Sequence, residues 1–275
     1  MKIKNLAFFL LILLFATSCN KNNQEKVIET TTKAKTMKTD DLLYSADGKN
    51  YKSFVAYDPN STEAKPVIFV IPEWWGLNDY AKNRAKQLAE LGYFAVALDF
   101  YGDGKNVDNP TDAQKLAEPF YKNSALGKAA FDAGRSQLKN FKIADVNKVA
   151  VIGYCFGGAQ ALNMGRQEND LKGVVSFHGN LMTGVKPNNN AVKYLICNGE
   201  ADTFVPKEEI ANFKKEMDSA KISYKFIDYP GAVHAFTNPA STAMGKKFDM
   251  KVAYNKEADE RSWSEMKAFF IEIFK

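Results

Sequence analysis

The stretch that decides the fold is Lys148–Gly158, which reads KVAVIGYCFGG. Its beginning, KVAVI, is an apolar run of the length of a buried strand, and the glycines that follow predict a sharp turn into a helix. Gly153 and Gly157 flank Cys155 in a G-x-C-x-G pattern. In such a turn the central residue takes a strained conformation, and side chains at the flanking positions would collide with nearby backbone. The pattern therefore predicts a strand, a projecting thiol and a helix in direct succession.

Cys155 is expected at the N-terminus of that helix, where the helix dipole stabilises a thiolate. The backbone N–H of Phe156 points toward the same place and can donate to an oxyanion. The alternative interpretation of the same residues is a buried structural cysteine that packs beside glycines. The order of the other polar residues along the chain bears on this choice.

Strand-length apolar runs alternate with helical periodicity on both sides of this stretch, which is typical of a mostly parallel sheet with helices on both faces. We expect one α/β domain over residues 41–275 with about eight strands. The expected strands are 42–44, 52–57, 66–71, 93–98, 148–152, 173–177, 193–197 and 224–229. The expected helices are 79–91, 125–138, 155–164, 207–220 and 257–274, and the segment 101–125 is expected to form a lid or variable loop.

Ligands of such sheets bind beyond the carboxyl ends of the strands. Asp202 follows the expected strand 193–197, and His234 follows the strand 224–229. Nucleophile, acid and base therefore occur in the order Cys155, Asp202, His234, as expected for this type of turn. In that arrangement His234 takes the thiol proton and Asp202 fixes the imidazole tautomer. Glu200 competes with Asp202 for the acid position.

The chain contains two histidines, and the second, His178, closes the strand 173–177. No acid-bearing loop follows it, so we expect a hydrogen-bonded wall residue of the cleft.

The loop after the strand 66–71 reads PEWWG, from Pro72 to Gly76. A loop in this place supplies a second oxyanion amide, here that of Trp74. On the residues alone, Glu73 is a solvated loop carboxylate.

Together the motifs PEWWG (72–76), GYCFGG (153–158), GEAD (199–202) and HAF (234–236) resemble the dienelactone hydrolase family, over residues 42–275. The resemblance implies an α/β-hydrolase fold with a triad of Cys155, His234 and Asp202. It also implies that Glu73 contacts the resting thiol and moves aside, or accepts its proton, when substrate binds.

The chain departs from that family where arginines hold the carboxylate of the substrate. Thr237-Asn238-Pro239 contains no arginine, and the segment 108–121 offers Lys115 instead. The loss of a bidentate guanidinium argues against tight recognition of the same dicarboxylic lactone. The resemblance therefore supports a shared activity more strongly than a shared substrate.

A cysteine nucleophile limits the reaction, because thiolate is itself a good leaving group and simple alkoxides lose the competition. We expect activated esters, enol-lactones or thioesters to be cleaved through a thioacyl-enzyme. A carboxylesterase or peptidase of the same fold, or an anchored binding protein without turnover, remain as alternatives. The cysteines and histidines have no zinc-site spacing and no phosphate loop or dinucleotide fingerprint occurs, so no metal and no cofactor are expected. Cys197, inside an apolar strand, is expected in the core, away from Cys155.

The composition excludes several other classes of protein. The chain has 275 residues, of which 45% are hydrophobic and 25% are charged, so it is neither wholly disordered nor a coiled coil. Three cysteines exclude a disulfide scaffold. The mean hydropathy of −0.34 excludes a protein with several membrane spans. The net charge of +5 is not gathered into a basic stripe, so no nucleic-acid partner is expected. The expected partner is a small ester or lactone, bound by a monomer or weak dimer.

The N-terminus has the pattern of an export signal. Lys2 and Lys4 precede the apolar run Leu6–Phe15, which is too short to span a bilayer but has the length of a signal h-region. The small residues Ala16-Thr17-Ser18 resemble a loose lipobox before Cys19. This predicts a signal peptide over 1–18 and lipidation of Cys19; the alternative is an ordinary secretory signal with Cys19 incidental.

The polar residues 19–40 cannot bury enough apolar surface to fold, which predicts a flexible tether. The expected product is an exported bacterial lipoprotein, held at the extracytoplasmic face of a membrane only through a lipid anchor at Cys19.

Overall fold

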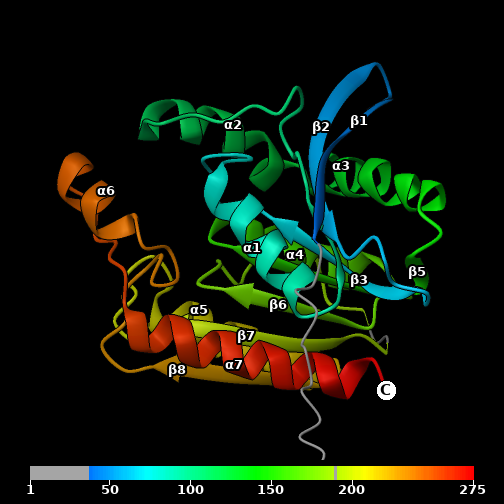
Figure 1. Ribbon diagram of the computed structural model, residues 1–275. Helices are drawn as coiled ribbons and strands as arrows, with labels where there is room; N and C mark the ends of the chain where they lie inside the picture. The colour runs from blue at the N-terminus through cyan, green and yellow to red at the C-terminus, as the bar shows by residue number, and fades with distance from the viewer. Residues whose placement is uncertain (1–36, 189–190) are drawn as a thin grey trace, which may run out of the picture. The chain divides into compact units, whose positions relative to one another are not determined.

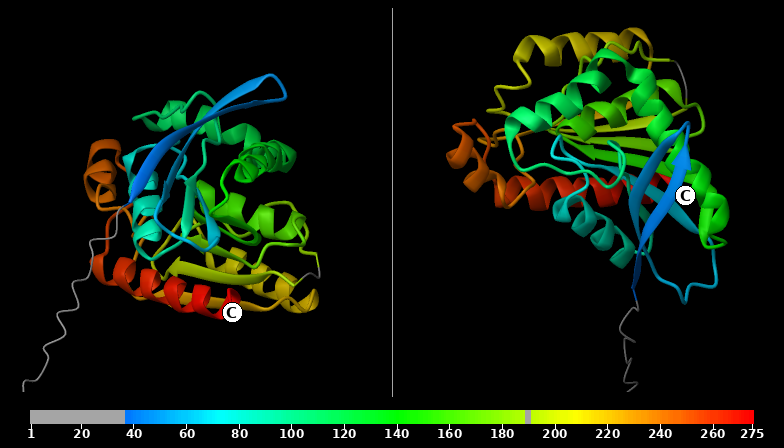
Figure 2. Two further views of the ribbon diagram at one scale, coloured as in Figure 1. Left: turned by 45° about the vertical axis from the view of Figure 1, so that its right-hand side comes forward. Right: turned by 90° about the horizontal axis from the view of Figure 1, so that it is seen from above.

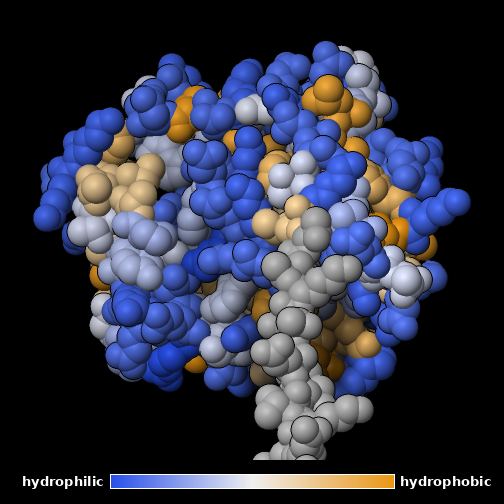
Figure 3. Space-filling view, in the orientation of Figure 1, coloured by the Kyte–Doolittle hydropathy of each residue, from blue (hydrophilic) through white to orange (hydrophobic). Residues whose placement is uncertain are grey.

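The computed structural model of this protein describes residues 37–188 and 191–275, all of which belong to one compact unit (Figure 1). The predicted signal peptide 1–18, the lipidation site Cys19 and the predicted tether up to residue 36 lie outside the described residues. In the described part, no helix combines the length and the apolar character needed to cross a bilayer. Polar residues cover most of the face shown in Figure 3, and its apolar patches are small and separate.

Eight strands form one sheet in the order β1-β2-β4-β3-β5-β6-β7-β8, which confirms the predicted α/β-hydrolase architecture. The β1–β2 and β2–β4 pairs are antiparallel, and every other pair is parallel. The strands are β1 (Lys38–Ala46), β2 (Lys49–Tyr57), β3 (Lys65–Ile71), β4 (Phe94–Ala97), β5 (Ala144–Tyr154), β6 (Gly173–Phe177), β7 (Lys193–Gly199) and β8 (Tyr224–Tyr229).

The first strand begins earlier than the sequence predicts. Lys38–Asp40, assigned to the tether, pair with Val55–Tyr57 of β2. Their side chains are exposed, because β1 is an edge strand. An exposed edge strand has the polar composition of a linker, which is why residues 38–40 resemble part of the tether in sequence. The hairpin turns at Asp47 and Gly48, whose φ angles of 51° and 74° suit a two-residue turn.

The helices are α1 (Asp79–Glu90), α2 (Pro110–Lys122), α3 (Ser124–Ser136), α4 (Phe156–Gln167), α5 (Lys207–Ser219), α6 (Ser241–Phe248) and α7 (Lys256–Ile273), with a short 3₁₀ helix at Gln137–Asn140. They form two layers with the sheet between them (Figure 2). On β3, Val67, Phe69 and Ile71 pack toward α2, α3, α4 and α5. Ile68 and Val70 pack toward α1 and α7. Since successive side chains of a strand point to opposite faces, both faces of this strand are buried, and it reads as a continuous apolar run.

Two helices were not predicted from the sequence. The expected lid or loop at 101–125 contains α2, which Asn109 caps and Pro110 begins. Its buried residues Ala113, Ala117 and Phe120 have helical spacing, but Pro119 suggests a break there because it removes a backbone donor. The second, α6, buries only Ser241 and Gly245 and therefore has almost no apolar stripe. Both helices flank the carboxyl ends of the parallel strands (Figure 1).

Candidate active site

The turn between β5 and α4 has the predicted geometry. Cys155 has φ 53° and ψ −118°, a conformation that non-glycine residues rarely adopt. A Cβ atom on Gly153 would lie 1.8 Å from the carbonyl oxygen of Gly157, and one on Gly157 would lie 2.2 Å from that of Ile71. Glycine is therefore required at both positions, because no side chain fits there. Cys155 is partly exposed, and it immediately precedes the first turn of α4.

Asp202 and His234 are brought together from the loops that follow β7 and β8. Asp202 Oδ2 lies 2.8 Å from His234 Nδ1, and Asp202 Oδ1 accepts a hydrogen bond of 2.8 Å from the N–H of Phe204. Glu200, the competing carboxylate, is exposed at the surface. The structure therefore pairs the imidazole with Asp202.

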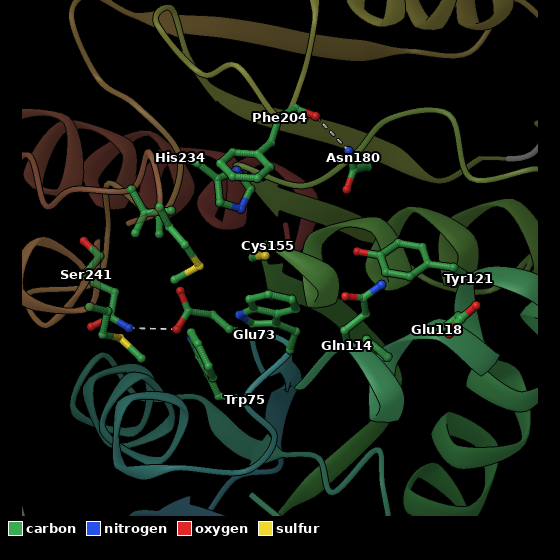
Figure 4. Close-up of a pocket in the computed structure, with 17 residues that line it drawn as sticks. Glu73, Trp75, Gln114, Glu118, Tyr121, Cys155, Asn180, Phe204, His234 and Ser241 are labelled. Atoms are coloured by element: carbon green, nitrogen blue, oxygen red, sulfur yellow. Dashed lines mark hydrogen bonds between the residues drawn. The ribbon is translucent and has the colours of Figure 1, made fainter. Parts of the chain in front are cut away.

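His234 and Cys155 line the same cavity (Figure 4). Burial lowers the pKa of His234, but the negative charges and hydrogen bonds of Cys155 and Asp202 outweigh burial and raise it to about 10. An imidazole in this position can hold a proton between a sulfur and a carboxylate. The side chains predicted from three separate strand ends thus lie at one site, where Asp202 is hydrogen-bonded to His234 and Cys155 lines the same cavity as His234.

Glu73 is buried beside this group rather than solvated. Only 3% of Glu73 is exposed, and its Oε2 accepts a hydrogen bond of 2.7 Å from Asn238 Nδ2. Burial raises the pKa of Glu73 to about 7, although Asn238 and His234 act in the opposite direction. Figure 4 shows the carboxylate and the imidazole on two sides of Cys155. A carboxyl group with this pKa exchanges protons near neutral pH.

Of the two predicted oxyanion donors, Phe156 directly follows Cys155 and Trp74 lines the cavity with it. The N–H of Phe156 is the first of α4, and the first N–H groups of a helix have no acceptor within it. Trp74 follows Glu73 in the loop after β3, and its carbonyl accepts a hydrogen bond of 3.0 Å from Tyr101 Oη. Buried Asp99 holds the loop that carries Tyr101 by accepting from four backbone amides, those of Lys52, Tyr101, Gly102 and Gly104.

A cavity of about 360 Å³ opens over Cys155. Sequence reasoning missed much of its lining, because Gln114, Glu118 and Tyr121 come from α2, and Ser241 and Met244 from α6 (Figure 4). The full lining is Glu73, Trp74, Trp75, Gln114, Ala117, Glu118, Tyr121, Cys155, Asn180, Phe204, His234, Ala235, Asn238, Ser241, Met244, Met250 and Val252. The lining is mostly apolar. Among these described residues Glu73 and Glu118 are the carboxylates, and none is a lysine or an arginine.

His178 lies outside this lining, so the predicted wall position is wrong. The ring is 1% exposed and sits beneath the thiol, with Nδ1 3.1 Å from the backbone nitrogen of Cys155. The chain reverses directly after β6, which turns the ring inward, with His178 at φ 43°. Ala235, beside His234, also has a positive φ, of 59°.

The remaining cysteine of the described part is remote from the site. Cys197 is fully buried in β7, separated from β5 by β6. Burial raises the pKa of the Cys197 thiol to about 12. In residues 37–188 and 191–275 no cluster of three or more His, Cys, Asp or Glu side chains could hold a metal ion.

Several known proteins are similar to this chain in sequence or in fold. "Protein usf" of Aquifex pyrophilus is 32% identical over 214 residues, which cover 75% of this chain and 88% of that protein. The crystal structure of a dienelactone hydrolase-like promiscuous phosphotriesterase from metagenomic libraries is 31% identical, with a TM-score of 0.80 over 86% of this chain and 98% of that one. Esterase 2 of Thermogutta terrifontis is 16% identical with a TM-score of 0.63 over 86% of this chain and 94% of that one, which shows the common fold alone.

The model of the family described as "Dienelactone hydrolase family" matches residues 53–274. This range contains β3 to α7 and every residue of the site described above. The chain therefore belongs to the dienelactone hydrolase family of α/β-hydrolases.

Proposed function

We propose that this protein is a cysteine hydrolase that cleaves activated esters, enol-lactones or thioesters through a thioacyl-enzyme. The observation that carries the proposal is the Asp202–His234 pair, joined at 2.8 Å, beside the strained Cys155. Membership of a hydrolase family supports the reaction class. The cavity of about 360 Å³ offers room for a small substrate over the thiol.

In the proposed reaction, His234 takes the proton of the Cys155 thiol and the thiolate attacks the substrate carbonyl carbon. The resulting oxyanion accepts hydrogen bonds from the N–H groups of Phe156 and Trp74. The intermediate collapses, the bond to the leaving oxygen or sulfur breaks, and His234 returns the proton to that atom. Water, deprotonated by His234, then hydrolyses the thioester and releases Cys155. Asp202 holds the imidazole in the required tautomer throughout.

Glu73 is proposed to control the resting thiol. In the protonated form it contacts the thiol without adding charge, and in the ionised form it can take the thiol proton when substrate binds. Its pKa of about 7 makes both forms available near neutral pH. Asn238 orients the carboxyl group in either form, since its amide can donate to one oxygen.

The first test concerns the nucleophile. Cys155→Ala should abolish turnover of p-nitrophenyl acetate, because it removes the sulfur that forms the proposed acyl-enzyme. The wild-type protein should show a burst of p-nitrophenol stoichiometric with enzyme, followed by a slower steady state, and iodoacetamide should eliminate both phases.

Cys197→Ala is the matched control, since it removes a thiol that lies in the core. It should keep the burst, although a small loss of stability is expected from the cavity it leaves. Full activity in Cys155→Ala would contradict the proposal. A panel with an enol-lactone, a thioester and a peptide anilide separates the alternatives: cleavage of the anilide at rates like those of the esters would indicate a peptidase.

The second test measures how the burial of the Glu73 carboxyl group affects the free energy of unfolding. Its pKa in the folded state, about 7, lies above the ordinary value of 4.5 for a glutamate side chain, so the folded protein binds more protons than the unfolded chain between these pH values. Stability therefore falls as pH rises through this window, by on the order of 3 kcal/mol in total. Glu73→Gln, which mimics the neutral form, should raise the melting temperature at pH 8 and have much less effect at pH 5.

Thermal unfolding followed by circular dichroism at both pH values measures this difference. Glu118→Gln, which removes an exposed carboxylate from the same cavity, serves as the control, and its effect should not grow between pH 5 and pH 8. An equal shift for Glu73→Gln at the two pH values would show that burial does not hold its proton.

The substrate class follows from the charges of the cavity. The described lining contains Glu73 and Glu118 but neither lysine nor arginine, so no bidentate guanidinium is available there to hold a substrate carboxylate. We propose that the protein acts on neutral esters or lactones and disfavours dicarboxylic ones. A neutral aryl phosphotriester is compatible with the same cavity and thiol, and the metagenomic relative is described as a promiscuous phosphotriesterase.

The third test compares iodoacetamide with iodoacetate as alkylating agents of Cys155, each rate divided by that with free cysteine. At pH 8 the neutral reagent should react faster on this scale, because the ionised carboxylate of buried Glu73 repels the carboxylate of iodoacetate. Mass spectrometry of the Cys197→Ala variant assigns the modification. Equal normalised rates would contradict a charge-selective cavity.

We further propose that the protein is an exported lipoprotein anchored through Cys19, on the evidence of the N-terminal sequence pattern alone. Cys19→Ala, or treatment of the producing cells with globomycin, should move the protein from the membrane to the soluble fraction, because the lipid chains supply the attachment. Immunoblotting of separated fractions measures this. Membrane retention of Cys19→Ala would contradict the anchor.

A further inference from the structure

A second imidazole, that of His178, supports the backbone of the thiol-bearing turn. The ring is almost fully buried at the end of β6, and its Nδ1 lies 3.1 Å from the backbone nitrogen of Cys155. The same N–H also points to the carbonyl oxygen of Phe177, at 3.0 Å. The amide of a strained residue is therefore held by two acceptors from the neighbouring strand end.

The hydrogen-bond pattern fixes the tautomer of this ring. Because the Cys155 N–H is a donor, Nδ1 of His178 accepts and the ring hydrogen resides on Nε2. Nε2 then donates to Thr237 Oγ1 at 2.7 Å, and the Tyr80 hydroxyl donates to the same oxygen at 2.7 Å. Both lone pairs of Thr237 Oγ1 are thereby used. Burial and the neighbouring His234 lower the pKa of His178 well below its ordinary value, which agrees with a neutral ring.

Thr237 is itself anchored from two helices. Arg84 of α1 donates from Nη2 to the carbonyl oxygen of Thr237 at 2.8 Å and forms an ion pair with Asp259 of α7. Arg84 Nε also donates to the Tyr80 hydroxyl at 3.3 Å. This connected group reaches from the far layer of helices to the peptide of Cys155, and each member except Tyr80 and Asp259 is almost fully buried.

We propose that His178 is a positioning residue, which Thr237 holds in the Nε2–H tautomer so that Nδ1 can fix the backbone of Cys155. The proposal rests on the proposed role of Cys155 as nucleophile. The orientation of the peptide at Cys155 sets where the sulfur lies relative to His234 and where the Phe156 N–H points. His178 contacts the backbone and not a carboxylate, so it holds the geometry and does not transfer protons.

Two pairs of variants test the role. His178→Phe removes the acceptor, whereas His178→Asn keeps one, because Asn Oδ1 stands where Nδ1 of histidine does. Thr237→Val removes the acceptor of the Nε2 hydrogen with little change of shape, and Thr237→Ser restores it. Asparagine tolerates the positive φ of 43° at this position, whereas the bulky phenylalanine does not. The threonine pair therefore keeps the test decisive if His178→Phe fails to fold.

We expect kcat for p-nitrophenyl acetate to fall about 10- to 100-fold in His178→Phe and Thr237→Val, as misplacement of a reacting group by about 1 Å can do. KM should change less than about two-fold, because neither residue lines the cavity. His178→Asn and Thr237→Ser should recover most of kcat. A merely structural role would lower the melting temperature of each pair without this separation of kcat from KM.

The outcomes distinguish this inference from the function on which it rests. If the wild-type protein has no turnover that depends on Cys155, both are overturned. If the wild-type protein is active and the folded variants His178→Phe and Thr237→Val keep its kcat, only the positioning role is overturned. Failure of His178→Asn and Thr237→Ser to recover kcat also contradicts it.

Discussion

The site depends on the lack of space in the turn between β5 and α4. The backbone of Gly153 and Gly157 packs so closely against its neighbours that no side chain fits at either position. This close packing forces Cys155 into a conformation that costs about 1–3 kcal/mol for a residue with a side chain. In return, the thiol projects from the end of a strand at the start of a helix, and every other group of the site is placed relative to it. The loops after β3, β7 and β8 bring Glu73, Asp202 and His234 to that one point.

The sheet and the positions of Cys155, Asp202 and His234 were predictable because each of these residues follows the end of a strand, of which β5 and β7 end in buried residues and β8 is partly buried. Asp202 and His234 stand a few residues after these strands, and parallel strands end at the same edge. The cavity was less predictable, since α2 contains a proline and α6 has almost no apolar stripe. The position of His178 was also missed, because the sequence does not indicate that the chain turns its ring beneath Cys155. The start of β1 was missed because an exposed edge strand has the composition of a linker.

Several costs to stability meet in this small volume. Cys155, His178 and Ala235 all have positive φ angles, and the carboxyl group of Glu73 is buried with the neutral amide of Asn238 as a hydrogen-bond partner. The two layers of the core offset these costs from outside the cavity. The helix α6 completes the cavity and contributes little to the core, whereas α2 packs Phe120 and Tyr121 against Phe156 of the turn. Variation in α6 can therefore change what the cavity accepts without disturbing the turn.

The burial of Cys197 has a practical consequence. In the part of the chain that the structure describes, the two thiols differ completely in access, since Cys197 is enclosed by the sheet and α7 while Cys155 opens into the cavity. A fluorophore or spin label carried by a maleimide would therefore attach at the base of the cavity and report on the environment there. Capture on a thiol-reactive resin would, for the same reason, immobilise this domain with its cavity blocked.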